Sequence, residues 1–342
     1  IHNGGPENIS NAQVQAAITN INSKFLSNNN FQIQFCLAQR DPLGNPTNGI
    51  TRDISQYTTE IMETEDILLK NINRWPPTCY LNIWVVKAIN SLSMGPNVIG
   101  YAYFPSSHGL NMDGVVIEAG YFGSSATDDA VITHEIGHYL GLYHTFQNGC
   151  ANNNCLLDGD QVCDTPPDQT TFSSCFPASN SCNTDADDIS SNNPFNNDVA
   201  DKGDDYMDYS SLSCYAQFTP GQYNRMQYFL TNTRYSLLNC LSCTTPCPAP
   251  LTAHITAPTT ATNVVTGTTI NFTGTATNSS SYKWYLNPGT TLSTSLSNTY
   301  TFNNPGIFWM KFRAISSNPL LCVDGIDSIQ VTVIQPAVAS CA

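Results

Sequence analysis

The chain has 342 residues, a length that suggests about two domains, and its 41% hydrophobic content is ample for packed cores. Only 11% of the residues are charged, and the formal net charge of −14 argues against binding to a nucleic-acid backbone, which requires clustered Lys and Arg. The sequence contains no apolar run long enough for a transmembrane helix, so none is predicted.

The number of cysteines indicates the redox compartment in which the protein folds. The chain has 13 cysteines, many of them between Cys150 and Cys247. Such density in a chain with few charges is typical of disulfides formed in an oxidising, extracellular setting. An odd number leaves at least one thiol unpaired or paired outside this chain. The sequence carries no signal peptide, so we expect that such a segment was removed before Ile1.

Hydrophobic periodicity predicts the elements at the start of the chain. Ser10 is a candidate N-cap for a helix over about Asn11–Leu26, and alternating apolar residues predict a strand at Phe31–Leu37. Tyr57–Ile72 is expected to form a second helix, and the apolar run Tyr80–Ala88 a central strand covered on both faces. The apolar stripe of the first helix consists of Val14, Ala17, Ile18, Ile21 and Phe25.

Two short strands and a third helix follow. Gly100–Phe104 is an aromatic strand closed by a proline, and Gly114–Gly120 is predicted to be another strand. Thr127–Leu140 is predicted to be a helix, with Asp128 and Asp129 placed favourably in its first turn.

The third predicted helix carries the pattern His-Glu-x-x-His-x-x-Gly-x-x-His. His134 and His138 lie one turn apart on one helix face, where two imidazoles can bind the same zinc ion. Glu135 can reach a metal-bound water and act as general base. Gly141 can end the helix and turn the chain back, so that His144 becomes the third ligand. A buried helix with incidental histidines is the alternative, but it leaves the glutamate and the glycine unexplained.

Three protein ligands and an open fourth position are typical of a catalytic zinc site, whereas a structural site is closed by a fourth ligand. These residues resemble the metzincin metallopeptidases, and further segments narrow the resemblance to the pappalysin group over roughly residues 1–240. The matching segments, in the same order, are Asn3–Ser10, His144–Phe146, Gly159–Asp160 with Asp164–Pro166, Tyr206–Tyr209 and Phe218–Gln222.

The resemblance implies an α+β catalytic domain, with a mixed twisted sheet and a zinc-binding helix, that acts as a secreted zinc endopeptidase on proteins or peptides. Glu135 would take a proton from the attacking water, and Tyr209 would stabilise the oxyanion. Met207 would support the ligands from below without binding the ion. In this arrangement Gly100–Phe104 is the edge strand to which an extended substrate adds, although an ordinary edge hairpin remains the alternative. A bacterial source and an extracellular location, with or without surface attachment, are also expected.

One departure from the family bears on specificity. In relatives that cleave before Arg or Lys, an acidic residue stands three positions after the tyrosine, where this chain has Leu212. An apolar side chain cannot neutralise a buried guanidinium or ammonium group, and leaving that charge unpaired is costly. We therefore expect apolar or small residues after the scissile bond.

The long loop from Cys150 to Tyr206 has features of a calcium site and of disulfides. Asp158, Asp160 and Asp164 lie close together beside backbone carbonyls, and the resemblance implies a structural calcium near Asp160 and Thr165. Solvated loop carboxylates are the alternative.

The resemblance also implies two disulfides: Cys175 with Cys214, and Cys182 with one of three candidates. The candidates for that partner are Cys150, Cys155 and Cys163.

A composition shift divides the chain. A helix opened by Thr219 and running to about Thr233 ends the catalytic domain, predicted as residues 1–240, and a Pro/Cys linker follows at 241–250.

Residues 251–336 are predicted to be an all-β sandwich and 337–342 a tail. Trp284 and a Pro-Gly-x-Phe pattern near Phe308 resemble modules of the polycystic-kidney-disease or immunoglobulin type. Such a module could be a spacer, a substrate grip or a tether that contacts a cell surface or polysaccharide. Its strands are expected at Thr269–Thr275, Tyr282–Leu286, Ile307–Ala314 and Ser328–Ile334.

Two other functions are considered as alternatives to the peptidase function. In the first, the protein is an adhesin whose β-module binds and whose metal site is vestigial; the presence of all three ligands and the base disfavours it. In the second, the zinc site hydrolyses non-peptide amides. The sequence contains no competing nucleophile motif such as Gly-x-Ser-x-Gly.

Overall fold

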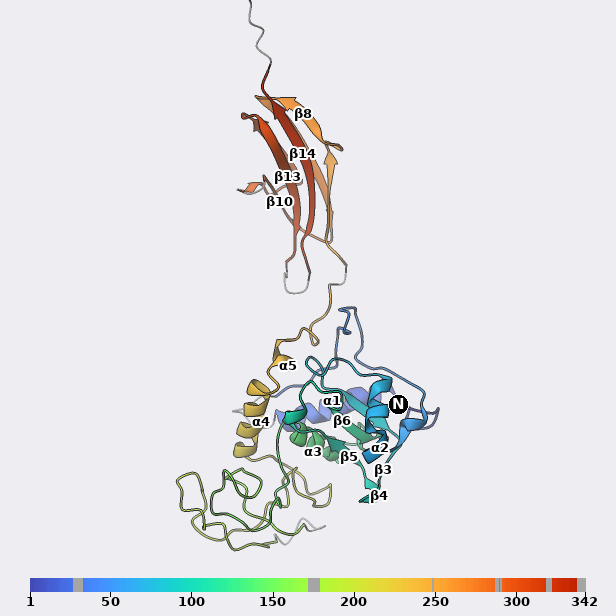
Figure 1. Ribbon diagram of the computed structural model, residues 1–342, viewed down its shortest axis with the longest axis vertical. Helices are drawn as coiled ribbons and strands as arrows, with labels where there is room; N and C mark the ends of the chain where they lie inside the picture. Colours follow the sequence, from blue (N-terminus) through green and yellow to red (C-terminus); the bar gives the residue numbers. More distant parts are fainter. Residues whose placement is uncertain are drawn as a thin grey trace, which may run out of the picture. The chain divides into compact units, whose positions relative to one another are not determined.

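The computed structural model describes residues 1–26, 33–171, 179–247, 249–286, 289, 291–317 and 322–336 (Figure 1). The chain forms two compact units, Ile1–Cys243 and Thr244–Ala342. Among the described residues, no helix has the length and apolar character needed to cross a membrane. The class predicted from the sequence, an α+β domain followed by an all-β domain, is confirmed.

Five α-helices of the first unit are described; four of them overlap the four predicted helices, and the short α5 was not predicted. Ser10 caps α1 by accepting a hydrogen bond from the Gln13 N–H, and the whole predicted apolar stripe of this helix is buried. Thr219 and Gln222 form a reciprocal capping box at the start of α4. The helices are α1 (Asn11–Phe25), α2 (Met62–Ile72), α3 (Asp129–Tyr139), α4 (Pro220–Asn232) and α5 (Ser236–Asn239).

The described strands of the first unit form two three-stranded sheets, with the orders β2-β6-β5 and β1-β3-β4. In the first sheet β6 is central; it runs parallel to β2 and antiparallel to β5, which gives the predicted mixed sheet. The strands are β1 (Thr59–Ile61), β2 (Ile83–Val86), β3 (Ala88–Ser91), β4 (Gly95–Val98), β5 (Gly100–Ala102) and β6 (Val115–Glu118).

The core of the first unit lies between this sheet and the helices. Side chains of α1, α3 and β6 form one buried cluster, which includes Ile21, Ile117 and Ile132, each with no exposed surface. Figure 1 shows α1 and α3 next to β5 and β6. Every residue of α3 is buried, so this helix is held on all sides rather than along one stripe.

The strand predicted at Phe31–Leu37 is wrong where the structure describes it. Residues 33–37 make no ladder, and residues 31 and 32 lie outside the described residues. The alternation is nevertheless reflected in packing, because Ile33, Phe35 and Leu37 contact the core. The Asn22 side chain takes the place of a strand partner: it bonds both the N–H and the carbonyl of Phe35, at 2.7 and 2.8 Å.

Two other boundaries differ from the prediction. The helix expected at Tyr57–Ile72 starts only at Met62, because Thr59–Ile61 pairs in parallel with β3. The run Tyr80–Ala88 is split between β2 and β3, which belong to different sheets, and β2 is an edge strand of its described sheet rather than a central one. Tertiary pairing overrides local periodicity in both cases.

Disulfides replace regular structure in the rest of the first unit. The described part of the loop from 150 to 206 contains no helix or strand, and Cys150–Cys182 and Cys155–Cys163 crosslink it. At the end of the unit, Cys36–Cys243 and Cys79–Cys240 attach the segment after α5 to the body of the unit. These bonds stabilise segments that bury too little apolar surface to order themselves.

The second unit consists of a five-stranded sheet, β11-β10-β13-β14-β8, and a three-stranded sheet, β12-β9-β7. Trp284 of β10 is fully buried, as predicted, and its ring lies 5.9 Å from that of Phe272 in β9 of the other sheet. The strands are β7 (Thr252–Ala257), β8 (Thr262–Val265), β9 (Thr268–Thr277), β10 (Ser281–Leu286), β11 (Thr291–Ser293), β12 (Ser297–Phe302), β13 (Gly306–Ile315) and β14 (Gly325–Ile334). The sequence predicted only β9, β10, β13 and β14.

One buried ion pair anchors the C-terminal end of α3. Arg234 is fully buried, and its guanidinium donates to both carboxylate oxygens of Asp113, at 2.8 and 2.9 Å. It also donates to the Tyr139 carbonyl at the end of α3, at 2.8 Å, and to the Tyr103 carbonyl, at 3.1 Å. A guanidinium can satisfy four acceptors in a fixed geometry, whereas an ammonium cannot.

Arg234→Met is therefore expected to lower the free energy of unfolding of the first unit by about 3–5 kcal/mol, because it leaves the buried Asp113 carboxylate unpaired. Denaturant unfolding of the full chain measures this. Arg52→Met is the matched control, since Arg52 is exposed and bonds only asparagine side chains on the surface. Equal losses for the two variants would contradict the assignment.

Candidate metal centre

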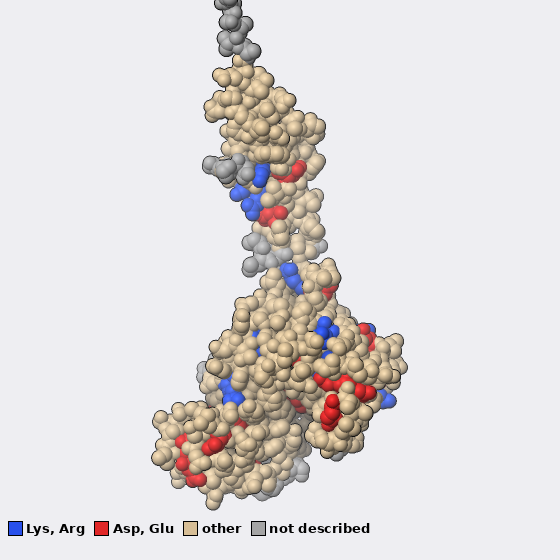
Figure 2. Space-filling view, in the orientation of Figure 1, with Lys and Arg blue, Asp and Glu red and all other residues tan. Residues whose placement is uncertain are grey.

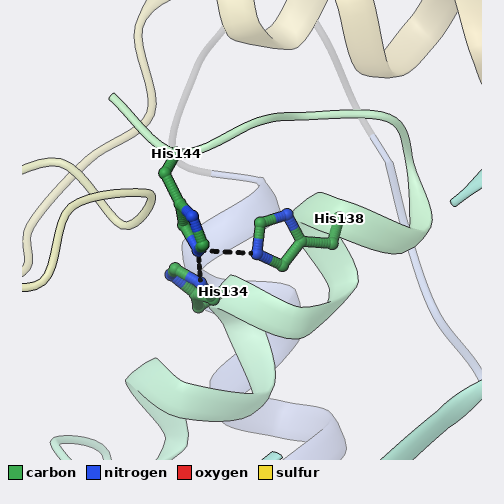
Figure 3. A group of neighbouring side chains, drawn as sticks. All are labelled: His134, His138 and His144. Carbon is green, nitrogen blue, oxygen red and sulfur yellow. Dashed lines mark hydrogen bonds between the residues drawn. The ribbon is translucent and has the colours of Figure 1, made fainter. Parts of the chain in front are cut away.

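Three imidazoles meet at the C-terminal end of α3 (Figure 3). His134 and His138 lie one turn apart on α3, and His144 reaches the same point from the segment that follows. The Nε2 atom of His144 lies 3.2 Å from Nε2 of His134 and 3.0 Å from Nε2 of His138. Among the described residues, this is the one group of three or more His, Cys, Asp or Glu side chains whose ligand atoms lie within 4.8 Å of one another.

The tautomers of two of these rings follow from their carbonyl partners. Nδ1 of His134 lies 2.7 Å from the Tyr206 carbonyl, and Nδ1 of His138 lies 2.7 Å from the Leu142 carbonyl. A carbonyl can only accept, so Nδ1 carries the proton in each ring and Nε2 presents a lone pair. Two lone pairs therefore face His144, whose Nε2 has at most one proton to share between them. A cation at the centre resolves this conflict.

The donor set fits zinc. Tetrahedral ligands with Zn–N bonds of about 2.0–2.1 Å stand roughly 3.3 Å apart, close to the two Nε2–Nε2 distances observed here. Burial also lowers the pKa of His144 to about 3, so the ring is neutral and available as a ligand at neutral pH.

Gly141 makes the turn that brings in His144. Its φ is +97°, in the left-handed region, and a Cβ atom there would lie 2.2 Å from the Phe229 ring. Both the backbone and the space therefore require glycine. α3 ends at Tyr139, and the Leu142 N–H returns to the Gly137 carbonyl at 2.9 Å. This is the chain reversal expected from the sequence.

Glu135 lies between the imidazoles and β5. A Cβ on Gly100 would meet Cγ of Glu135 at 3.0 Å, so the glutamate packs directly against the backbone of the edge strand. Its side chain is 7% exposed, and burial raises the pKa of its carboxyl to about 8 in the metal-free protein. A carboxylate in such surroundings binds a proton more tightly than one in water.

Met207 and Tyr209 lie on two sides of the imidazoles. Met207 is fully buried, and its sulfur lies so close to Gly137 that a Cβ there would approach it to 2.5 Å. Tyr209 is 55% exposed; its ring lies 4.6 Å from that of His144 and 5.5 Å from that of His134. The methionine thus fills space beneath α3, while the tyrosine lies at the solvent side of the centre.

The residues of the predicted calcium site are only partly brought together. The Thr165 hydroxyl lies 2.8 Å from both carboxylate oxygens of the buried Asp160. Asp164 faces elsewhere: it accepts from the Thr219 hydroxyl and from the Gly221 N–H at the start of α4. It therefore binds a helix N-terminus, a favourable place for a carboxylate.

The predicted disulfide partners are resolved in part. Cys182 pairs with Cys150, one of the three candidates, and the other two, Cys155 and Cys163, pair with each other. Cys214 is disulfide-bonded, but Cys175 lies outside the described residues. Leu212 is half-buried and packs against the core of the first unit.

Sequence reasoning missed the groups that orient the ligands. The Tyr206 carbonyl, 72 positions from His134, receives its ring N–H, and Gly100 makes room for Glu135. A backbone carbonyl leaves no residue-type signal. The tyrosine does directly precede the methionine that the family pattern singled out, which was the one available clue.

Comparison with known proteins identifies the family of this chain. Residues 64–231 match the family model of peptidase family M43, described as pregnancy-associated plasma protein-A. An "Extracellular metalloprotease" of Arthroderma gypseum is 31% identical over 235 residues, which cover 66% of this chain and 68% of that protein. The chain belongs to the M43 family. The predicted resemblance to pappalysins is thus confirmed.

Two further comparisons are informative. An "Extracellular metalloprotease" of Verticillium alfalfae is 41% identical over 153 residues, or 42% of this chain. The match spans 48% of that protein, so the chain covers about half the length of this curated relative. Among solved structures, mirolysin in complex with compound 9 aligns with a TM-score of 0.52 and 28% identity, over 69% of this chain and 92% of mirolysin. The curated relatives named here are fungal, so the expected bacterial source finds no support.

The metal assignment predicts a stoichiometry. The full chain dialysed against zinc-containing and then zinc-free buffer is expected to retain about one zinc per molecule, and His138→Ala to retain far less than one. Elemental analysis measures both. His254→Ala is the matched control, because His254 is exposed and lies in the second unit. One equivalent of zinc retained by His138→Ala would contradict the site.

Proposed function

We propose that this chain is a secreted zinc endopeptidase. The observation that carries the proposal is the convergence of three Nε2 atoms beside a buried glutamate and a half-exposed tyrosine. Membership of the M43 family supports the peptidase chemistry, and the relatives named as extracellular support secretion. So do the disulfides, which form and persist in oxidising compartments.

His134, His138 and His144 would hold the zinc ion. When bound, zinc would polarise the scissile carbonyl and make a water molecule acidic enough to react near neutral pH. Three protein ligands would leave one coordination position of the ion open, as catalytic rather than structural zinc requires, and Tyr209 lies beside the imidazoles. The Tyr206 and Leu142 carbonyls hold two of the rings in place.

Glu135 moves the proton. It would accept a proton from the attacking water and pass it to the leaving amine, a role that a single carboxylate beside the ligands can fill. Its burial makes the carboxylate a stronger base than an exposed glutamate. Tyr209 lies at the solvent side of the imidazoles, where its hydroxyl can donate to the oxyanion as negative charge develops.

β5 would orient the substrate. This edge strand pairs with β6 on one side, and Gly100 at its start touches Glu135. An extended peptide that pairs with the other edge of β5 would therefore run past the general base. Leu212, three positions after Tyr209, supports a preference for an apolar or small residue after the scissile bond, because it offers no charge to a basic side chain.

Three further predictions belong to this proposal. A structural calcium near Asp160 is supported by the burial of that carboxylate beside Thr165. The boundary between the catalytic domain and the linker, predicted at about residue 240, is supported by the shift in composition. A contact of the β-sandwich with a cell surface or polysaccharide stays a prediction without support.

Glu135→Ala is expected to lower casein hydrolysis by at least about 10³-fold, because the proton has no other acceptor, while zinc content stays near one per molecule. Glu118→Ala, which removes a partly buried glutamate of the same unit, serves as control and should retain most of the activity. Unchanged proteolysis by Glu135→Ala would refute the mechanism. Intact zinc binding without proteolysis by the wild type would favour the adhesin, and cleavage of simple amides alone would favour the non-peptide hydrolase.

The specificity claim has its own test. A proteome-derived peptide library digested by the wild-type chain is expected to show apolar or small residues after the cleaved bond. Leu212→Asp should shift the profile toward Arg and Lys, because a buried carboxylate can pair with their charge. A wild-type profile dominated by Arg or Lys at that position would contradict the role of Leu212.

A further inference from the structure

A group of charged side chains from β1 and α2 is buried beside β5. On the face of the protein drawn in Figure 2, acidic side chains lie at the surface, where water surrounds them. Glu60 of β1 and Lys70 of α2 instead have no exposed surface, and Asp66 of α2 is 5% exposed. Charges in such a place need partners, because burying an unpaired charge is costly.

Asp66 has the partners that a buried carboxylate requires. The Lys70 ammonium lies 2.6 Å from its Oδ1 atom. The hydroxyls of Tyr101 and Tyr103 donate to Oδ1 and Oδ2, at 2.7 and 3.1 Å. The ammonium also donates to the Met112 carbonyl, at 2.8 Å, and lies 4.2 Å from the centroid of the Tyr103 ring. Three donors thus converge on Asp66, and the one cation of the group is committed to it.

Glu60 lacks such partners. Its Oε1 atom lies 2.9 Å from the Tyr101 hydroxyl, and its Oε2 atom is buried without a hydrogen-bond partner among the described residues. The Tyr101 hydroxyl carries a single proton, and Asp66, at 2.7 Å, is the nearer of its two acceptors. The contact between Glu60 and Tyr101 is therefore fully satisfied only if Glu60 supplies a proton of its own.

A protonated Glu60 completes a chain of hydrogen bonds. Its O–H donates to the Tyr101 oxygen, and the Tyr101 O–H then donates to Asp66. When Glu60 is ionised, two carboxylates compete for one phenolic proton, and a negative charge is buried without a counter-cation of its own. The change between these two states therefore alters how firmly Tyr101 is held.

The surroundings of Glu60 place this change near neutral pH. Burial is the largest influence and raises the pKa of Glu60 to about 7. The Tyr101 hydrogen bond and the Lys70 charge act to lower this pKa, whereas the charges of Asp66 and Glu65 act to raise it. None of these residues belongs to the group of imidazoles that forms the metal centre.

We propose that protonated Glu60 positions the substrate strand β5 through Tyr101. This rests on the proposed peptidase function, in which an extended peptide pairs with the free edge of β5. Tyr101 directly follows Gly100, at which a Cβ atom would lie 3.0 Å from Cγ of Glu135. A movement of Tyr101 toward or away from α2 would therefore shift the strand relative to the general base.

The shortness of β5 makes it dependent on this contact. The strand has three residues, and β6 is its one neighbour in the described sheet. Tyr101 is its middle residue, and Tyr103, one position beyond its end, donates to the same carboxylate. Asp66 thus holds the strand through two hydroxyls, and the state of Glu60 decides whether the first of them is shared.

The first test detects the proton without using activity. Glu60→Gln introduces an amide that can still donate to Tyr101 but does not titrate. Glu65→Gln is the matched control, because Glu65 accepts the Ile61 N–H and makes no contact with Tyr101. Both are made in the zinc-loaded, full-length Glu135→Ala chain, so that self-cleavage cannot interfere, and denaturant unfolding is followed at about pH 5 and about pH 8.

The folded chain binds the Glu60 proton more tightly than the unfolded chain, so its contribution to stability is full below the ordinary glutamate pKa and is lost as pH rises through about 7. Between the two pH values the folding equilibrium constant is expected to fall up to about 100-fold more in the parent chain and in Glu65→Gln than in Glu60→Gln. Equal pH dependence in the parent chain and in Glu60→Gln would overturn the proposal.

Hydrogen exchange examines the strand itself. Exchange of the amides of residues 100–104, corrected for the intrinsic rate at each pH, is measured by mass spectrometry in the same chains. At the higher pH, protection is expected to be at least about tenfold greater in Glu60→Gln than in the parent chain, and at the lower pH the two should agree. Tyr101→Phe should show weak protection at both. Protection in the parent chain that does not change with pH would contradict the proposal.

Activity decides whether the strand positions the substrate. In the chain that retains Glu135, KM for a peptide substrate is expected to rise about threefold or more from about pH 6 to about pH 8, and to stay constant in Glu60→Gln. The kcat profile should be the same in both, because the general base is unchanged. A KM that varies equally in both would overturn the positioning role. Absence of proteolysis by the wild type would refute the proposed function instead, and the unfolding and exchange measurements would still decide whether Glu60 holds the proton.

Discussion

The metal centre depends on two backbone carbonyls. Leu142 and Tyr206 each accept an imidazole N–H and thereby set the tautomer and the direction of His138 and His134. With both Nε2 lone pairs turned inward, the third imidazole completes a set of donors that a cation must balance. Without these bonds the rings could rotate, and the same three residues would no longer define one binding point.

Those two carbonyls explain much of the surrounding structure. Leu142 is in place because Gly141 reverses the chain, a turn that Phe229 would block for any larger residue. Tyr206 is in place because its own N–H bonds the Gln217 carbonyl and because the next residue, Met207, packs beneath α3. Arg234 then fixes the end of α3 through the Tyr139 carbonyl. The fold thus holds the ligand geometry through contacts from four different parts of the chain.

The loop between the metal centre and Met207 is kept in order by other interactions than an apolar core. It has almost no apolar core of its own, and disulfides, buried aspartates and side-chain caps supply its order. Buried carboxylate oxygens without a partner are unfavourable, since each unmade hydrogen bond costs about 1–3 kcal/mol or more.

The sequence by itself determined what depends on short spacing. A four-residue interval put His134 and His138 on one helix face, the glycine three positions later indicated the turn, and apolar periodicity located α1, α3 and α4. Only the tertiary structure decided what depends on distant partners. The segment after α1 became a packed but unpaired chain because Asn22 took its hydrogen bonds, and β1 formed because β3 was beside it. The carbonyl partner of His134 and the carboxylate partner of Arg234 lie 72 and 121 positions away in the chain, and no local pattern encodes such contacts.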